Sequence, residues 1–466
     1  MTDIIDNIIK YLPAVEEPIG VPSATDRLKT LFFALLIFFF FYNTPAIGTK
    51  MATGGLDFMQ MIVASRWGSL MTLGIGPLVF ASLLMLVLKG MGALKLDPAD
   101  PIQRQKYLGI QKILGILMAF FQGFQFAFSP YIVVMQDTPL VRAFVAIQFA
   151  LASVIILFID EAVTKYGLGS GIGLFIAAGV SYMIFAGAVG LFIGPGGVLD
   201  IVAEGGATVF AEVLKTLIPL ISTIVIFLTV AYVEGIKIRI PLLLPGYGAG
   251  RRFHEIPLLY VSNIPVIFAT GLLFYVQFFG AALSGIHHPL VKYIAVVDNG
   301  RIVDGLLYLI TPVYVGRGLF ANYEYLLSGH TPVLGIPEWF HALVYLLFLM
   351  VVSAWIGLIW IEGTQAGPAD VAEMLASRGM GIRGMRVSKK ILQKKLEEYI
   401  PIVTVIGSAF VGLLAGMANL TGALGTGTGV LLTVGIIYRM YLQAKQQGVI
   451  DNLKLPEWLQ GVLVGA

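Results

Sequence analysis

The sequence predicts an all-α, polytopic membrane protein with ten transmembrane helices, arranged as two halves of five helices. Composition gives the first indication: 58% of the 466 residues are hydrophobic, 12% are charged, and the mean hydropathy is +0.88, far from soluble norms. Apolar segments long enough to cross a bilayer recur along the whole chain. Glycine or proline interrupts the chain at the mouth of several of these segments, which favours a pore or a transport site over a passive anchor.

Each predicted span reaches the roughly 17–20 apolar residues that are needed to cross the hydrocarbon core. The first span has no small-residue cleavage site after it, so we expect a retained helix rather than a signal peptide. The boundary between the last two spans has two interpretations, because 422–429 fits either a loop or a kink. In chain order the spans cover about 27–43, 70–90, 109–135, 140–159, 172–193, 214–233, 257–280, 339–361, 400–422 and 428–444.

The distribution of basic residues predicts the orientation of these spans. Most of the 30 Lys and Arg residues fall on the loops of one side, and the largest cluster runs from Arg378 to Lys395. The positive-inside rule therefore predicts that both termini are cytosolic. Before the first span, isoleucines at positions 4, 5, 8 and 9 follow helical spacing, which predicts a helix lying on the membrane surface.

Ten spans divide into an N-terminal half, 1–205, and a C-terminal half, 206–466. Two similar halves with an odd number of spans must lie upside down relative to one another, as in inverted-repeat transporters and channels. One correspondence supports this symmetry: the second span carries Pro77 and the seventh carries Pro265, each followed by apolar residues. The C-terminal half also contains two long cytosolic loops, at about 234–256 and 362–399.

The middles of the ten spans contain no Asp, Glu, Lys or Arg. Ion- and proton-coupled carriers usually need such a residue at depth, so its absence argues against a secondary transporter. Three stretches instead combine glycine with branched aliphatics, at 74–79, 167–176 and 425–432. A pore lined by Ile, Val and Leu excludes ions and water by dewetting. We expect its passenger to be large and tolerant of an apolar constriction.

The sequence offers no chemistry for an enzyme, a cofactor or a metal site. It contains no cysteine, and neither a Walker A lysine nor an HExxH pair occurs. Glycine recurs at every second position from Gly167 to Gly173, which is not the dinucleotide fingerprint. A metal at His287 and His288 is an alternative to an ordinary polar loop, and the loop is the favoured interpretation.

Four motifs, in order along almost the whole chain, resemble the SecY family, the channel subunit of the Sec protein translocase, and most closely its archaeal members. The run from Phe158 to Ile176 (FIDEAVTKYGLGSGIGLFI) resembles the signature between the fourth and fifth spans. The segment 64–77, from ASRWG to GIGP, resembles the second-span signature. The segments 260–267 (YVSNIPVI) and 425–433 (GTGTGVLLT) resemble the seventh and tenth spans.

The resemblance implies a pore ring and a plug. Spacing agrees with the ring for two pairs, Ile75 with Val79 and Ile172 with Ile176, because residues four apart share a helix face. Without the resemblance, packing or lipid contact is the ordinary role of such aliphatics, and the plug segment fits a re-entrant loop. The implied ring consists of Ile75, Val79, Ile172, Ile176, Ile267 and Leu432, and the implied plug, a short helix over about 56–66 outside the ring, includes Leu56, Phe58, Met59, Ile62 and Arg66.

The resemblance also implies a lateral gate between spans two and three on one side and spans seven and eight on the other. Gln122 and Asn263 are amides inside otherwise apolar spans, so each needs a partner. They would bond either to one another across the gate or each within its own half. Phe80 and Leu86 stand where relatives often carry polar residues, and Gln122 replaces an acid of some relatives, which predicts a more apolar gate.

The cytosolic loops are the predicted docking face. Apolar and basic residues alternate over 236–240, and a turn near Pro245 precedes Arg251 and Arg252, which predicts a hairpin with a basic tip. The resemblance implies that this loop and the loop containing Arg383 meet the ribosome through RNA phosphates. Orientation in the membrane alone would also explain these charges.

The resemblance implies a protein-conducting channel of the cell (plasma) membrane. Such a channel passes unfolded secretory polypeptides and releases apolar segments sideways into membrane lipid. Its implied partners are SecE, a small single-span third subunit, and a ribosome or other motor on the cytosolic face. The alternatives are a secondary solute transporter of the inverted-repeat type, which would need a polar midplane site, and an insertase of the YidC type, which would need a buried charge.

Overall fold

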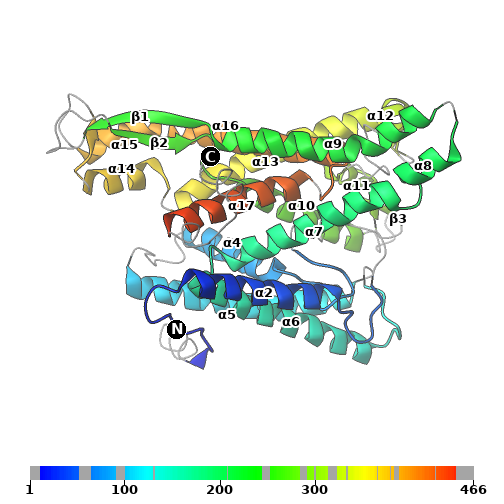
Figure 1. The fold of residues 1–466 in the computed structure, drawn as a ribbon, viewed down its shortest axis with the longest axis horizontal. Helices are drawn as coiled ribbons and strands as arrows, with labels where there is room; N and C mark the ends of the chain where they lie inside the picture. The colour runs from blue at the N-terminus through cyan, green and yellow to red at the C-terminus, as the bar shows by residue number, and fades with distance from the viewer. Residues whose placement is uncertain are drawn as a thin grey trace.

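Each of the ten predicted spans corresponds to a helix in the computed structural model of the chain (Figure 1). The structure describes residues 11–51, 64–90, 100–129, 132–206, 208–243, 252–283, 291–298, 301–312, 323–331, 334–364, 366–377, 379–382, 388–425 and 427–447. The predicted surface helix before the first span lies outside these residues. The ten helices are α2 (Ala24–Asn43), α4 (Gly76–Gly90), α5 (Pro101–Ala127), α6 (Pro139–Tyr166), α7 (Gly171–Ile193), α9 (Val209–Glu234), α10 (Ile264–Leu283), α13 (Glu338–Gly363), α16 (Ile400–Leu420) and α17 (Gly427–Gln446).

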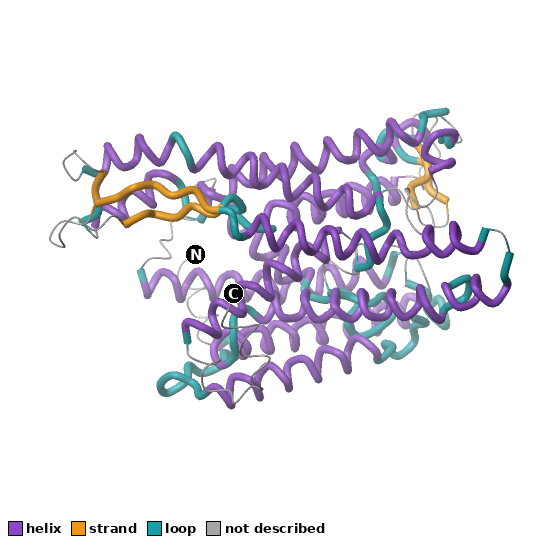
Figure 2. The backbone as a smooth tube through the Cα atoms, turned by 45° about the horizontal axis from the view of Figure 1, so that its top comes forward, coloured by secondary structure: helices purple, strands orange, loops and turns teal. Residues whose placement is uncertain are grey.

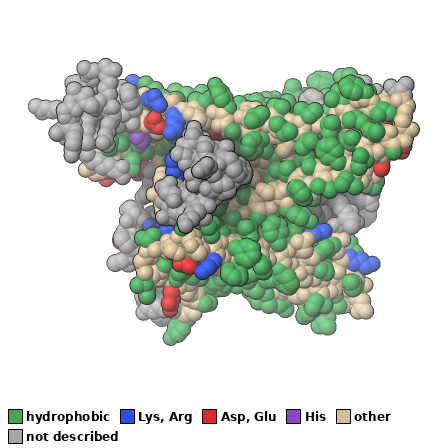
Figure 3. All heavy atoms as spheres, viewed as in Figure 1, with side chains coloured by type: hydrophobic (Ala, Val, Ile, Leu, Met, Phe, Trp, Pro, Cys, Tyr) green, Lys and Arg blue, Asp and Glu red, His purple; other side chains and the backbone are tan. Residues whose placement is uncertain are grey.

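The described helices present an apolar exterior suited to lipid. Six of them, α5, α6, α7, α9, α13 and α16, are long and apolar enough to cross a membrane by length and composition alone. Figure 3 shows hydrophobic side chains over the central part of one face, with charged side chains mostly toward its two ends. This pattern confirms a multi-pass membrane protein.

The second helix of each half starts later than its predicted span, and for the same reason. The predicted spans at 70–90 and 257–280 become the shorter helices α4 and α10, which begin at Gly76 and Ile264. The chain turns just before each helix, with φ of +53° at Gly74 and +55° at Ser262. Each of these residues stands three positions before a proline in the first helical turn, where the missing N–H of proline costs no hydrogen bond.

The boundary between the last two spans is a turn and not a kink. Helix α16 ends at Leu420, and α17 begins at Gly427. Gly422 and Gly425 both have positive φ, +68° and +77°, a conformation that side chains with a Cβ rarely adopt. The sequence therefore breaks the helix at this point as the loop interpretation predicted.

The helices form two groups with four helices between them. Figure 1 places α2, α5 and α6 on one side and α9, α13 and α16 on the other, with α4, α7, α10 and α17 toward the middle. Helices α7, α8 (Val198–Glu204) and α9 make the connection between the groups at one end of the molecule (Figure 1). Helix α2 begins and α17 ends toward the opposite end, so the described termini lie on the same side.

A small sheet joins the two long loops of the C-terminal half. Strands β1 (Lys237–Leu243) and β2 (Arg252–Pro257) pair antiparallel, which confirms the predicted hairpin. Strand β1 also pairs with β5 (Gly381–Ile382), through Leu242 opposite Ile382. Helices α14 (Pro368–Ser377) and α15 (Lys389–Glu397) contribute to the apolar core beneath the sheet. Because of this pairing, the two loops form one compact module (Figure 2).

Short elements that the sequence analysis did not predict cover the opposite end, between α10 and α13. A buried polar network holds them to α13. Glu338 Oε1 accepts hydrogen bonds from the hydroxyls of Tyr308 (2.9 Å) and Tyr325 (3.3 Å), and its Oε2 lies 3.0 Å from His341 Nδ1. These elements are α11 (Val291–Ile294), β3 (Val296–Asp298), β4 (Arg301–Asp304), η1 (Tyr308–Ile310) and α12 (Tyr323–Ser328).

The contact between α13 and α16 requires glycine and provides a test of the packing. A Cβ built on Gly412 would lie only 2.5 Å from the carbonyl oxygen of Leu349, so backbone must move to admit it. We expect Gly412→Ala to lower the free energy of unfolding by about 1–3 kcal/mol, the usual cost of overpacking. Denaturant titration in detergent micelles would measure this change.

The matched control for this prediction is Gly190→Ala. Gly190 also lies inside a span helix, but an added Cβ there would meet no atom within 4 Å. We expect this variant to be as stable as the parent protein or slightly more stable, because alanine favours the helix. Equal destabilisation by the two substitutions would contradict the packing argument.

Candidate functional site

The six aliphatic residues of the implied pore ring lie in one apolar cluster between the two groups of helices. This cluster also contains aromatic side chains, such as those of Phe38 and Phe175, and is called the aliphatic cluster below after its ring residues. Ile75, Ile176 and Leu432 are buried members of this cluster, with exposed fractions of 0%, 3% and 0%. The other three ring residues are partly buried and pack against it. The ring positions are therefore joined through the apolar contacts of this cluster. The three partly buried members are Val79, Ile172 and Ile267.

Four helix starts bring these side chains together. Ile75 immediately precedes α4, and its carbonyl accepts a hydrogen bond from Val79 N–H at 3.1 Å. Ile172 and Ile267 lie in the first turns of α7 and α10, and Leu432 lies in the second turn of α17. Each residue is thus fixed by the start of its own helix. The interruptions that the sequence analysis identified are the places where these helices begin.

Most of the implied plug lies outside the described residues, including Leu56, Phe58, Met59 and Ile62. Its C-terminal end is described. Ala64 is buried in the aliphatic cluster and has a positive φ of +49°, a strained conformation for a residue with a Cβ. Arg66 Nη1 donates to Asn43 Oδ1 at 2.8 Å, and its guanidinium lies 5.7 Å from the ring centroid of Tyr42. Arg66 therefore ties this end of the segment to α2.

The two amides of the implied gate do not bond to one another. Asn263 Nδ2 donates to the carbonyl of Leu431 at 2.7 Å, within the C-terminal half. Gln122 Nε2 donates instead to the hydroxyl of Tyr275 at 3.0 Å, which joins α5 to α10. Because Tyr275 lies twelve residues beyond Asn263, it is about 18 Å further along the helix axis, so Gln122 reaches a different level of α10.

Tyr275 is the residue that the sequence analysis missed. The ring of Phe80 on α4 also packs against it, with centroids 5.2 Å apart, so contacts from both α4 and α5 converge on this one side chain. A signal was present, because a tyrosine inside an apolar span needs a partner for its hydroxyl. Contacts between α4 and α13 complete this seam. The side chain of Leu86 is outside the described set.

Helix α5 is fastened to α6 near its C-terminal end and near its middle. Arg142 Nη1, on α6, donates to the carbonyl of Ala127 at 2.7 Å, and the same guanidinium pairs with Asp137. Near the middle of α5, Lys112 lies 2.6 Å from Glu161 of α6. These contacts are within the N-terminal half, so α5 is held more firmly to its own half than to α10.

The predicted docking residues are only partly described. Arg251 and Arg383 lie outside the described residues, and Arg252 belongs to β2 without a described side chain. On the neighbouring strand, Lys237 and Arg239 both approach Glu255, at 2.9 and 3.3 Å. Hydrogen bonding to Lys237 holds the pKa of Glu255 below its ordinary value, so this carboxylate stays ionised and offsets part of the basic charge.

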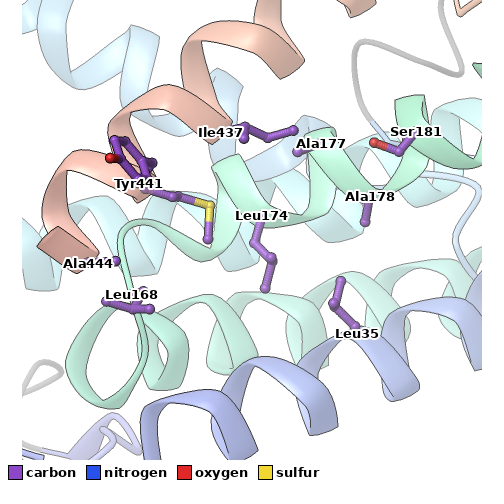
Figure 4. Close-up of a pocket in the computed structure, with 10 residues that line it drawn as sticks. Leu35, Leu168, Leu174, Ala177, Ala178, Ser181, Ile437, Tyr441 and Ala444 are labelled. Atoms are coloured by element: carbon purple, nitrogen blue, oxygen red, sulfur yellow. The ribbon is translucent and has the colours of Figure 1, made fainter. Parts of the chain in front are cut away.

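A cavity of about 410 Å³ opens beside the aliphatic cluster, between α2, α7 and α17 (Figure 4). Apart from the hydroxyls of Ser181 and Tyr441, its lining side chains are apolar, with Leu35, Leu174 and Ala177 among them. Within the described parts of the chain, there is also no group of His, Asp and Glu that could hold a metal ion. The apolar lining of this cavity differs from the polar midplane site that a solute carrier needs.

Comparisons with known proteins agree with this architecture. The SecY family model matches residues 69–441. The chain is 38% identical over 450 residues to the protein translocase subunit SecY of Methanocaldococcus jannaschii, covering 95% of this chain and 96% of the relative. A solved protein-conducting channel aligns with a TM-score of 0.77 at 37% identity, over 96% of this chain and 99% of that one. Sec61 from a canine ribosome-channel complex aligns with a TM-score of 0.72 at 35% identity, over 96% and 99%.

The hydrogen bond between Gln122 and Tyr275 can be tested by a double-mutant cycle. We expect Tyr275→Phe to destabilise the protein, because it removes the acceptor of Gln122 Nε2 and leaves a buried amide without that partner. Gln122→Leu in the same background should then cost less than it does alone, with a coupling of about 0.5–1.5 kcal/mol. Free energies of unfolding in micelles would measure the cycle, and additive effects would contradict the bond.

Proposed function

We propose that this chain, which belongs to the SecY family, conducts unfolded polypeptides through a constriction formed by its aliphatic cluster. It is the channel subunit of a protein translocase and moves secretory polypeptides across a membrane. The observation that carries the proposed constriction is the convergence of six aliphatic side chains from four helix starts on one buried apolar cluster. The matching channel structures support the same role.

The proposed ring combines sealing with passage. Ile75, Ile176 and Leu432 are buried members of one apolar cluster, so water and ions would find no polar path between them. A polypeptide in extended form would push these side chains aside and replace their mutual contacts with contacts to its own backbone and side chains. Because dispersion contacts have little directional preference, such a ring accepts chains of many sequences.

The segment at about 56–66 is proposed as the plug that closes the ring from the side opposite the docking face. The contact of Ala64 with the aliphatic cluster supports this role, because it brings the C-terminal end of the segment against the ring. Arg66, bonded to Asn43 and stacked on Tyr42, would anchor this end while the rest of the segment moves. Strain at Ala64 would favour a hinge there.

The seam between α4 and α5 on one side and α10 and α13 on the other is proposed as the lateral gate. Across this seam, Phe80 and Gln122 both contact Tyr275. Because α5 is fastened to α6, we infer that the gate opens by movement of the N-terminal half as a unit and not by bending of α5 alone. An apolar segment inside the ring would then partition into lipid according to its transfer free energy.

We propose the sheet module as the cytosolic docking face, and we propose further that both termini are cytosolic and that the protein lies in the cell (plasma) membrane. The ribosome as partner is supported by the canine ribosome-channel complex, whose Sec61 channel has a similar fold. Arg251, Arg252 and Arg383 would contact RNA phosphates. We infer further that SecE and a small single-span subunit complete the complex. The channel itself would need no cofactor and catalyse no reaction, so the ribosome or another motor supplies the energy.

Site-specific crosslinking to a stalled secretory chain tests the constriction. Photoreactive residues would replace Ile75, Ile176 and Leu432 in turn, and the matched controls would replace Phe32 and Leu36, which are exposed on α2. We expect crosslinks to the stalled chain from all three ring positions, because an extended polypeptide must touch every side of the constriction. The two controls should not react with it.

Two outcomes of this experiment would contradict the proposed constriction. Silence at all three ring positions, while the stalled chain remains bound, would make these side chains packing residues. Equal reaction at the α2 controls would mean that the chain passes along the lipid-facing surface. Either result would leave the family membership intact and remove the ring from the mechanism.

The lateral gate predicts a change in the insertion of marginally apolar segments. We expect Tyr275→Phe to raise the ratio of inserted to translocated segments about twofold to tenfold, because one hydrogen bond of about 0.5–1.5 kcal/mol no longer opposes opening. Glycosylation mapping of test segments in reconstituted vesicles would measure this ratio.

The matched control for the gate is Ser82→Ala. This change removes a hydrogen bond of similar kind, from Gln111 Nε2 to Ser82 Oγ at 2.7 Å, that joins α4 and α5 within the N-terminal half. We expect no shift in the insertion ratio from this variant. Equal shifts from both variants would show that general loosening, and not the cross-gate bond, controls insertion.

A further inference from the structure

Asp160 is a carboxylate that the proposed conduction mechanism does not use. It lies near the end of α6, in the segment that precedes the ring residues of α7. Its neighbour Glu161 is occupied by two lysines, Lys112 at 2.6 Å and Lys165 at 3.0 Å. Asp160 points instead toward the start of α7, so the two adjacent carboxylates serve different helices.

The carboxylate of Asp160 caps α7 from outside that helix. Its Oδ1 accepts a hydrogen bond from the backbone N–H of Ile172, the second residue of α7, at 2.7 Å. The first N–H groups of any helix lack partners within the helix. Ser170, which stands at the N-cap position, makes no capping hydrogen bond with its side chain. The usual capping residue is therefore replaced by a group from α6.

Close packing fixes this arrangement. A Cβ built on Gly171 would lie 2.6 Å from Asp160 Cα and 2.7 Å from Asp160 Oδ1, distances that real side chains do not adopt. Only glycine allows the start of α7 to approach α6 so closely. The contact and the hydrogen bond together determine where α7 begins relative to α6.

The position of this helix start matters because it carries two residues of the constriction. The backbone N–H of Ile172 itself donates the hydrogen bond to Asp160, and Ile176 lies one turn later on the same face of α7. A carboxylate at a helix N-terminus also interacts favourably with the helix dipole. Loss of the carboxylate would free the first turn of α7 to shift or fray, and both ring side chains would move with it.

We propose that Asp160 is a positioning residue for the closed constriction: by capping α7 it holds Ile172 and Ile176 in the sealed arrangement. This inference rests on the proposed function of the aliphatic cluster. It assigns Asp160, one of the two acidic residues of the 158–176 motif, a role in sealing the channel, and no role in contact with the polypeptide.

The absence of cysteine from the sequence allows a direct test with thiol reagents. A single Ile176→Cys substitution introduces a thiol at a position that is 3% exposed in the resting protein. In proteoliposomes of the full chain without substrate, a small water-soluble methanethiosulfonate would label it slowly. We expect Asp160→Leu to raise the labelling rate about tenfold, the change expected for losing one hydrogen bond to a charged group.

Two further variants separate positioning from a general structural effect. Asp160→Asn retains an acceptor at Oδ1, so we expect it to restore labelling to within about twofold of the Ile176→Cys protein. Ser170→Ala removes the N-cap hydroxyl that makes no capping bond and should leave the labelling rate unchanged. Labelling as fast in Asp160→Asn or Ser170→Ala as in Asp160→Leu would overturn the proposal.

Gly171→Ala keeps the test decisive if Asp160→Leu does not fold. This variant retains the carboxylate but forces the start of α7 away from Asp160, so faster labelling is again expected. Unchanged labelling in both Asp160→Leu and Gly171→Ala would overturn the positioning role. If a stalled chain still crosslinked to Ile176 in that case, the constriction itself would stand, whereas loss of the crosslink would reject the proposed function instead.

Discussion

The structure depends on one constraint: helices that start inside an apolar environment must find partners for backbone groups that water cannot reach. Four helices begin around the aliphatic cluster, and at the start of α7 a carboxylate from α6 supplies such a partner. Asp160 accepts from the N–H of Ile172. The requirement at α7 is therefore met by a residue outside the aliphatic cluster.

The contacts within each half differ in kind from the contacts across the seam between α4 and α5 on one side and α10 and α13 on the other. Within the N-terminal half, Arg142 and Lys112 fasten α5 to α6 through charged contacts. Within the C-terminal half, glycine brings α16 against the backbone of α13. Across the proposed gate, by contrast, the polar contact is the hydrogen bond from Gln122 to Tyr275, and the ring of Phe80 and contacts between α4 and α13 add apolar packing. Movement is therefore expected at the seam and not within either half.

The sequence predicted the parts of the fold that follow from hydropathy and from motifs. Every predicted span corresponds to a helix, and the six ring positions share one cluster. Of the two alternatives for the gate amides, a direct bond between them is absent, and a bond within its own half is present for Asn263 but not for Gln122, which bonds to Tyr275 of the other half. Sequence spacing cannot settle this, because it does not give the level at which a residue of α5 meets α10. The short elements between α10 and α13 were missed because they lack helical or strand periodicity.

A seal made of aliphatic contacts has a consequence for selectivity. Dispersion and burial act between any apolar surfaces, so the ring cannot recognise a sequence, and separation of its side chains costs free energy roughly in proportion to the apolar area exposed. A passing chain that fills the gap restores part of this burial, whereas an ion does not and meets a dewetted barrier. In the proposed mechanism, discrimination between secretory and membrane segments then comes from the proposed gate, where contact with lipid would begin. Asp160 would set the shape of the proposed ring at α7, and the apolar groups within the ring would determine what can pass.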